Sequence, residues 1–457
     1  MLEGLDDVPW ADLEHGYGAA DDVPDFLRQL LDPDPTTRAE AFEALHVRVF
    51  HQGTRYQATP YVVPFLLEMC SDPSSPDRGT LLGFWGSLIT GYFSIQERPF
   101  WGDGERLHAT DHILEMQQPE DHTIALHRIY RESLAGHGLA CDLLDDDEPN
   151  VRANAAWLLA CLPTMAEASI PGLEARLNVE PSGAVRAAIA FALGELGAAD
   201  ALRRILDEDE AAEARCVAAC ELARIGPTAS LIDPLLEFLA EPIDGYESIP
   251  GVGGKSTGDA AFAISLLPGE ARRWAIPAIC DRLDQARSFD TMPLVQALLA
   301  TAFTPRDEAL TELTALQREV LVRMVNTEEL WMIGNLTWAF RAYGLPHRRE
   351  ACARLVGIKV ANDPALAELR TALAYAEIGF LGKAREGIDR ALEADPIVFE
   401  RSPSPDECWL LCAKAFAETD PERALEAYRL AISINPAVAH HIHRTWRLAD
   451  LLDAEES

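Results

Sequence analysis

The sequence of 457 residues predicts an all-α fold, an α-solenoid built from stacked helical hairpins. Two observations predict it. Small and apolar side chains recur at helical spacing behind a repeated arginine, and short acid- or proline-rich turns separate these segments. Aromatic residues make up only 7% of the chain, which favours helices that pack through small side chains.

Four arginines mark the second helix of a hairpin, because each stands seven residues before a leucine with small residues between them. The arginines are Arg38, Arg152, Arg186 and Arg215, and the leucines are Leu45, Leu159, Leu193 and Leu222. The last three arginines are 34 and 29 residues apart. This spacing fits two helices of about a dozen residues and two short turns, which is one hairpin per repeat.

A leucine-rich first helix and a polar turn precede each arginine, as in the turns 32–35, 145–149 and 207–210. Elsewhere the pattern is weaker. It predicts further helix pairs within 64–88, 235–267, 276–298 and 307–344. The glycine-rich stretch 241–258 interrupts one of them. Its end resembles a phosphate-binding loop, but Ile249 stands where the first glycine belongs and no strand precedes it, so we expect a plain loop.

The segments VRANAAWLLACL, VRAAIAFALGELG and ARCVAACELARIG resemble the second helix of HEAT repeats, in the short bacterial variety also seen in phycobilin-lyase proteins. In that family the arginine pairs with an acid from a neighbouring turn and ties adjacent repeats together. The resemblance therefore implies an inter-repeat structural role for Arg38, Arg152, Arg186 and Arg215.

The carboxyl-terminal part changes pattern. Residues 372–396 and 412–436 resemble two tetratricopeptide units, with Ala384 and Ala424 at the small-residue position of each and a proline-serine insert at 401–405 between them. The resemblance implies peptide binding or capping of the array. We therefore divide the chain into an atypical HEAT-like region at 1–138, a HEAT-like array at 139–345 and a tetratricopeptide-like segment at 346–457.

Charge and cysteine usage bound the function. The net charge is −35, from 74 acidic against 39 basic residues, so the chain repels nucleic acid and anionic membranes and attracts basic protein surfaces. Nine scattered cysteines, no signal peptide and no long apolar stretch predict a reduced, cytoplasmic protein. We expect a non-catalytic scaffold, adaptor or inhibitor without a cofactor, for instance an immunity or regulatory protein, whose inner helices present the binding surface.

One group of residues near the amino terminus has the composition of an interface, with hydrogen-bonding groups beside amphipathic aromatic rings. The predicted partner-binding residues are His51, Gln52, Arg55, Tyr56, Trp85, Tyr92 and Trp101. The alternative interpretation is that His51 and Tyr56 only satisfy backbone amides in the turn between two helices.

Two enzymatic alternatives stay open. His108, His112 and Glu115 in the histidine-rich region 108–127 would share one face of a helix and could hold a metal ion, with a third imidazole from His122 or His127. A HEAT-like glycosylase that grips nucleic acid would need a basic channel, and the candidates are Arg98, Arg106, Arg128 and Arg131. The net charge opposes the second alternative.

Overall fold

The computed structural model confirms the predicted all-α helical repeat fold. It describes residues 1–434 except 52–53, 91–120, 253, 287–289, 307, 328, 333–335, 361–364, 366–367, 370–371, 374–375, 377–380, 400–404 and 417–419. The chain forms two compact units, Met1–Ile279 and Cys280–Ser457, here called the first and second units. Their border falls inside the range 139–345 that the sequence predicts as a single array.

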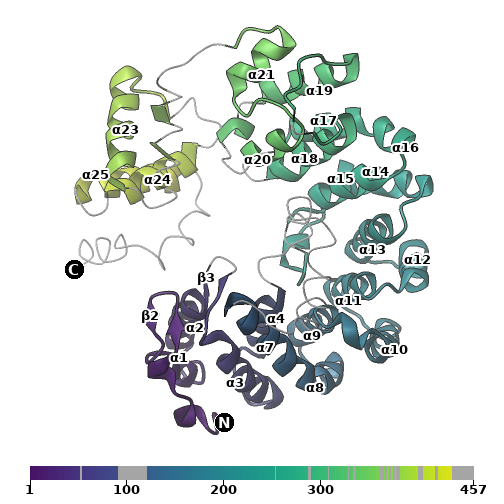
Figure 1. The fold of residues 1–457 in the computed structure, drawn as a ribbon, viewed down its shortest axis with the longest axis vertical. Coiled ribbons are helices and arrows are strands. Elements are labelled where there is room, and N and C mark those ends of the chain that lie inside the picture. Colours follow the sequence, from purple (N-terminus) through teal and green to yellow (C-terminus); the bar gives the residue numbers. More distant parts are fainter. Residues whose placement is uncertain are drawn as a thin grey trace. The chain divides into compact units, whose positions relative to one another are not determined.

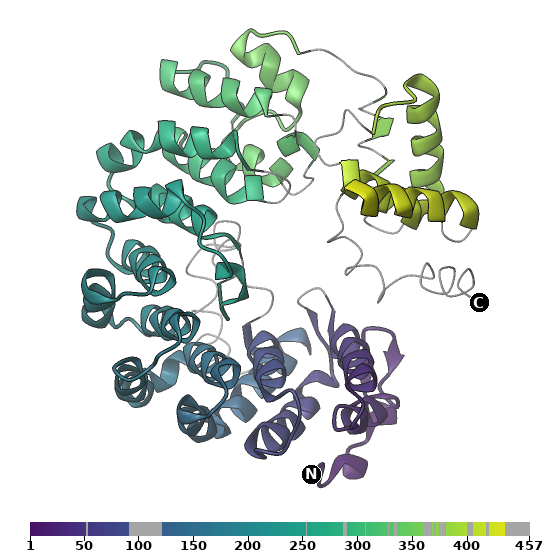
Figure 2. The same ribbon diagram turned by 180° about the vertical axis from the view of Figure 1, so that it is seen from behind.

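The first unit consists of helix pairs that stack side by side in chain order (Figure 1; Figure 2). The first helices are α1 (Val23–Gln29), α3 (Thr59–Ser71), α8 (His137–Asp142), α10 (Ala166–Leu177), α12 (Ala199–Glu208) and α14 (Ile232–Ala240). The second helices are α2 (Pro35–Val49), α4 (Arg78–Thr90), α9 (Pro149–Ala160), α11 (Gly183–Glu195), α13 (Ala212–Ile225) and α15 (Ser256–Leu266). The remaining α-helices are α7 (Asp121–Ala135) and α16 (Gly269–Trp274), and the border between the units falls inside α17 (Ile276–Leu283).

Short 3-10 helices and two small β-hairpins complete the first unit. The 3-10 helices are η1 (Leu5–Asp7), η2 (Trp10–Asp12), η4 (Leu143–Asp145), η5 (Pro163–Met165), η6 (Ala229–Leu231) and η7 (Tyr246–Ser248). In one hairpin β1 (Glu14–His15) pairs with β2 (Gly18–Ala19), and in the other β3 (Phe50–His51) pairs with β4 (Thr54–Arg55), both antiparallel. The sequence did not predict these hairpins, because two-residue strands are too short to show an alternating pattern.

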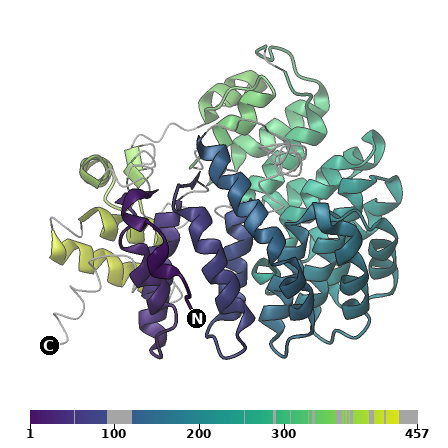
Figure 3. The same ribbon diagram turned by 60° about the horizontal axis from the view of Figure 1, so that its bottom comes forward.

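The second helices begin where the sequence supplies a start signal. Pro35 and Pro149 occupy the first helical position, where a missing N–H costs nothing, and the Asp34 carboxylate accepts the Thr37 N–H at 3.1 Å. Figure 3 shows the resulting helices side by side, with the turns that join them at their ends.

Small residues let neighbouring second helices approach closely. A Cβ added at Gly86 of α4 would lie 2.6 Å from the Trp157 ring of α9, and one at Gly194 of α11 would lie 2.5 Å from Glu221 of α13. Close packing of this kind buries most residues of α4, α9, α11, α13 and α15, and every residue from Val151 to Ala160 is buried. The helix α2 buries only Ala41, Leu45 and Val49.

The glycine-rich loop between α14 and α15 adds to this burial. Gly251 has φ +83°, and a Cβ there would lie 2.6 Å from Phe191 of α11 and 2.7 Å from Trp157 of α9. Tyr246 and Ile249 of the same loop are also buried. The loop therefore covers part of α9 and α11, and the prediction that the inner helices present a binding surface stays a prediction.

The second unit contains α18 (Thr291–Ala302), α19 (Ala315–Asn326), η9 (Glu329–Met332), α20 (Leu336–Ala342), α21 (Arg349–Val356), α23 (Leu381–Ala394), α24 (Pro405–Phe416) and α25 (Pro421–Ile434). Ala384 and Ala424, the small residues of the two predicted tetratricopeptide units, are fully buried in a shared core. The Phe399 and Trp409 rings stack in that core with their centroids 4.2 Å apart.

Candidate functional site

An arginine near the start of the second helix joins each helix pair to the next, and we call this series the arginine ladder. The four arginines predicted from the sequence all contact a carboxylate of the following pair. Measured from guanidinium nitrogen to carboxylate oxygen, the pairs are Arg38 with Asp77 at 2.6 Å, Arg152 with Glu180 at 2.8 Å, Arg186 with Asp209 at 2.9 Å and Arg215 with Glu237 at 3.9 Å.

Arg78 is a further member of the ladder that sequence reasoning missed. It opens α4, and its guanidinium lies 2.8 Å from the Asp146 carboxylate in the turn of the next described pair, α8 and α9. The residue seven positions later is Trp85 rather than leucine, so the sequence column did not include it. A better signal is an acid six residues before the arginine, which Asp72 supplies here.

That acid recurs because it shapes the turn. In each of the five turns its side chain accepts the backbone N–H two residues later, at 2.8–3.0 Å. The acid and N–H partners are Asp32 with Asp34, Asp72 with Ser74, Asp146 with Glu148, Glu180 with Ser182, and Asp209 with Ala211. Three of these acids, Asp146, Glu180 and Asp209, also accept the ladder arginine of the preceding pair.

Arg152 and Glu180 form the most buried pair, with side chains 6% and 0% exposed. Both guanidinium–carboxylate bonds measure 2.8 Å, and Arg152 also donates to the carbonyls of Asp146 and Asp147. Burial alone would raise the pKa of Glu180. The hydrogen bonds from Arg152, the Ser182 N–H and Arg176 outweigh burial and lower this pKa to about 2.

The ladder has a consequence for the surface, because it places successive turns along one edge of the first unit. We call these turns, 30–34, 72–77, 143–148, 178–182 and 207–211, the turn rim. Several of its carboxylates point to solvent and are not ladder acids. These exposed acids are Asp34, Asp145, Asp147, Glu148, Asp207, Glu208 and Glu210.

The predicted partner-binding arginine, Arg55, makes structural contacts within the first unit. It donates at 2.9 Å to the carbonyls of Leu88 and Ile89, which end α4, and it lies over the Phe50 ring. Burial lowers the pKa of Arg55 to about 10. The hairpin β3–β4 thus satisfies the carbonyl end of a helix.

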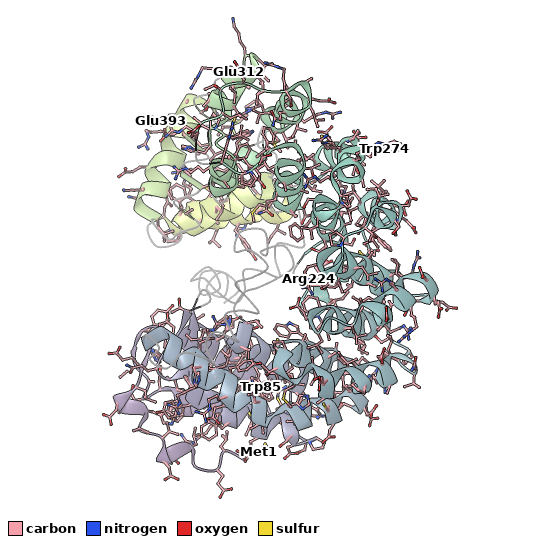
Figure 4. The ribbon with its side chains drawn as sticks, turned by 45° about the vertical axis from the view of Figure 1, so that its right-hand side comes forward. Met1, Trp85, Arg224, Trp274, Glu312 and Glu393 are labelled. Carbon is pink, nitrogen blue, oxygen red and sulfur yellow. The ribbon has the colours of Figure 1, made fainter. Side chains whose placement is uncertain are left out.

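Tyr56 and Trp85 are also held by contacts within the first unit. The Tyr56 N–H donates to Thr59 Oγ1, and a Cβ at Gly16 would lie 3.2 Å from the Tyr56 ring. Trp85 is fully buried and donates from Nε1 to Ser133 Oγ at 2.8 Å. It lies among packed helices, whereas Trp274 projects outward (Figure 4). The prediction of Trp85 as a contact residue is therefore corrected to a core role.

Other predicted residues lie outside the described part of the chain. Neither the backbone nor the side chain is described for Gln52, Tyr92 and Trp101. For His51 the structure describes only the backbone, which belongs to β3. The predicted metal ligands His108, His112 and Glu115, and the arginines Arg98 and Arg106, fall in the same category. Of the other two channel arginines, Arg128 lies over the Tyr61 ring at 4.2 Å and Arg131 is exposed.

Two constellations resemble catalytic groups, and their geometry argues against that use. His137 Nε2 lies 2.9 Å from Ser169 Oγ and 3.7 Å from Cys141 Sγ. Burial lowers the pKa of His137 and raises that of Cys141, so neither the thiolate nor the imidazolium is favoured. The other constellation pairs His15 Nε2 with Asp22 at 2.9 Å, but His15 Nδ1 accepts the Tyr17 N–H and has no lone pair left for a substrate.

Within the described residues, no three His, Cys, Asp or Glu side chains lie close enough together to hold a metal ion. No single described helix is long and apolar enough to cross a membrane. Only α9 taken together with 163–177, bent by 94°, meets the length and composition of a span.

Comparison with known proteins leaves the family open. The sequence matches no protein family and no curated protein. Among solved structures, an engineered protein matches 90% of this chain over 99% of its own length, with 15% sequence identity and a TM-score of 0.27.

Proposed function

We propose that this protein is a non-catalytic scaffold, adaptor or inhibitor whose turn rim binds the basic surface of a partner protein. The observation that carries the proposal is the arginine ladder. It uses one set of acids to hold the turns together and leaves a second set, such as Asp147 and Glu210, exposed along the same edge.

The charge of the chain supports the same proposal. A net charge of −35 produces a field that attracts cationic surfaces and speeds their association. The partner is expected to be a protein, because exposed carboxylates repel phosphate backbones. We also propose action in the cytoplasm, since every cysteine whose side chain the structure describes is a free thiol.

We further propose that the first unit is HEAT-like and that the segment from 381 onward is tetratricopeptide-like. The ladder supports the first assignment, because each arginine contacts an acid of the next pair, which is the role that the resemblance implies. The buried alanines Ala384 and Ala424 support the second assignment.

Affinity capture from native lysate at rising salt tests the proposal. We expect stoichiometric recovery of one basic protein, with recovery falling steeply as salt screens the exposed carboxylates. Identification of the recovered chain by mass spectrometry gives its isoelectric point. Recovery of an acidic protein, salt-independent recovery or no recovery would contradict the proposal.

A further inference from the structure

A cavity of about 630 Å³ opens in the first unit beside the last arginine of the ladder. It lies between the pair α12–α13 and the start of α14. Its polar lining includes Arg203, Arg215, Thr228, Asp233 and Glu237, and its apolar lining includes Leu206, Leu222 and Leu231. A volume of this size accommodates a few side chains of a bound peptide.

Arg215 is held more loosely than the other ladder arginines. Among the described residues it donates one long hydrogen bond, 3.3 Å to the Leu206 carbonyl, and its nearest carboxylate, Glu237, is 3.9 Å away. Arg152, in contrast, makes two 2.8 Å bonds to Glu180. The Arg215 side chain is 31% exposed against 6% for Arg152. The Arg215 guanidinium also lies over the Phe238 ring, 5.7 Å from its centroid, and it lines the cavity.

The loose contact has a local cause. In the preceding pairs the acid comes from a short turn that begins the next second helix, as Asp209 does before α13. Between α14 and α15 that turn is replaced by the loop 241–255, which packs on α9 and α11. Glu237 comes from the body of α14 instead, and its side chain is 65% exposed.

We propose that this cavity binds a carboxylate of a partner peptide, which takes the place that a turn acid occupies elsewhere in the ladder. The other ladder pairs show that an arginine at this position donates hydrogen bonds to a carboxylate with good geometry. The Thr228 and Ser230 hydroxyls, which are 2.9 Å apart, add hydrogen-bonding groups at the wall.

The lining of the cavity also predicts which peptide residues stand on either side of the bound carboxylate. Asp207 and Asp233 line it and are exposed, so they favour cationic residues on either side of the bound acid. The ligand class is thus a peptide with one acidic residue between basic ones. Only these cationic flanks rest on the proposed function, because the carboxylate site rests on Arg215 alone.

Two peptides test the inference on the full chain, Ac-Lys-Ala-Asp-Ala-Lys-NH2 and its Asn counterpart, each with a fluorophore for anisotropy measurements. We expect the Asp peptide to bind about tenfold more tightly, the effect of one charge-assisted hydrogen-bonded pair. Arg215→Gln should reduce this ratio to about one. Arg204→Gln is the matched control and should preserve the ratio, because Arg204 lies on the same helix α12 and is paired with Glu174 at 2.6 Å but does not line the cavity.

Glu237→Gln provides the second, independent variant. Since Glu237 competes for Arg215, its neutralisation should raise the Asp-to-Asn ratio, even though the cavity loses a negative charge. If Arg215→Gln does not fold, Glu237→Gln alone tests whether Arg215 binds the peptide carboxylate. Equal binding of the two peptides, tighter binding of the Asn peptide, no binding of either, or a ratio that Glu237→Gln leaves unchanged would overturn the inference.

The outcomes also separate this inference from the proposed function. If both peptides bind equally and release with salt, the carboxylate site is wrong and the acidic rim stands. If the Asp peptide binds selectively while lysate capture recovers no basic protein, the site stands and the proposed function fails.

Discussion

Arg152 and Glu180 form the most buried pair of the ladder, with side chains 6% and 0% exposed. A buried guanidinium needs a partner for most of its N–H groups. Arg152 finds these in one carboxylate and two turn carbonyls, so the same side chain closes its own turn and holds the next one.

Removal of this guanidinium should destabilise the fold strongly. In Arg152→Gln the buried Glu180 keeps Arg176 and the Ser182 N–H but loses its two bonds to Arg152. We expect a loss of about 3 kcal/mol, visible as a lower urea midpoint for unfolding by circular dichroism. Arg203→Gln, which breaks an exposed pair, should cost less than about 1 kcal/mol. Equal midpoints for the two variants would show that the ladder does not stabilise the array.

The lowered pKa of Glu180 predicts a dependence of stability on pH. Its pKa is about 2 in the folded chain against 4.5 for the free group, so its contribution is present above pH 4.5 and is lost as pH falls toward 2. The full contribution is about 3 kcal/mol. Urea unfolding across this range should show a smaller loss for Glu180→Gln than for the wild type. Parallel curves would contradict the assignment.

At the scale of helices, the sequence predicted the pairs well where a start signal and an apolar column coincide. The pairs α8–α9, α10–α11 and α12–α13 lie where the arginine column places them. Arg78 was missed because Trp85 replaces the expected leucine, although the ring fills the same buried position in α4. The hydrogen bond of a turn acid to a backbone N–H is invisible in a hydrophobic pattern, so the regular Asp72-to-Arg78 spacing escaped notice.

The candidate site could be predicted less well than the fold. Residues such as Arg55 and Trp85 have the composition of an interface, but their contacts are with α4 and α7 of the same unit. A sequence shows which side chains are able to bind, whereas burial decides which of them remain available. The turn rim emerges only once the ladder shows that distant acidic turns share an edge.

The loop between α14 and α15 should be sensitive to one methyl group. Gly251→Ala would place a Cβ within 3 Å of Phe191 and Trp157 at a φ of +83°, so the loop would have to leave α9 and α11. We expect a destabilisation of about 2 kcal/mol and new proteolytic cleavage within 243–252. Gly269→Ala is the control, since no atom lies within 4 Å of its Cβ position. Unchanged resistance to protease would contradict this packing of the loop.

At the scale of the whole molecule, the chain combines buried second helices with a strongly acidic exterior. The carboxylates in the described part of the first unit fall into two groups. Those that accept ladder arginines hold adjacent pairs together, and those beside them face solvent. A surface of this kind keeps a long helical array soluble and also favours basic partners. The two roles can be distinguished experimentally. Solubility depends on the net charge of the chain, whereas specific binding depends on where the exposed carboxylates lie on the surface.

The most direct measurement therefore compares two variants of equal net charge in the lysate capture. The rim variant carries Asp145→Asn, Asp147→Asn and Glu148→Gln, and the control neutralises Glu40, Glu167 and Glu270, three exposed acids outside the turn rim. We predict that the rim variant recovers about tenfold less of the basic partner while the control recovers as much as the wild type. Equal recovery by the two variants would contradict the claim that the turn rim is the binding surface.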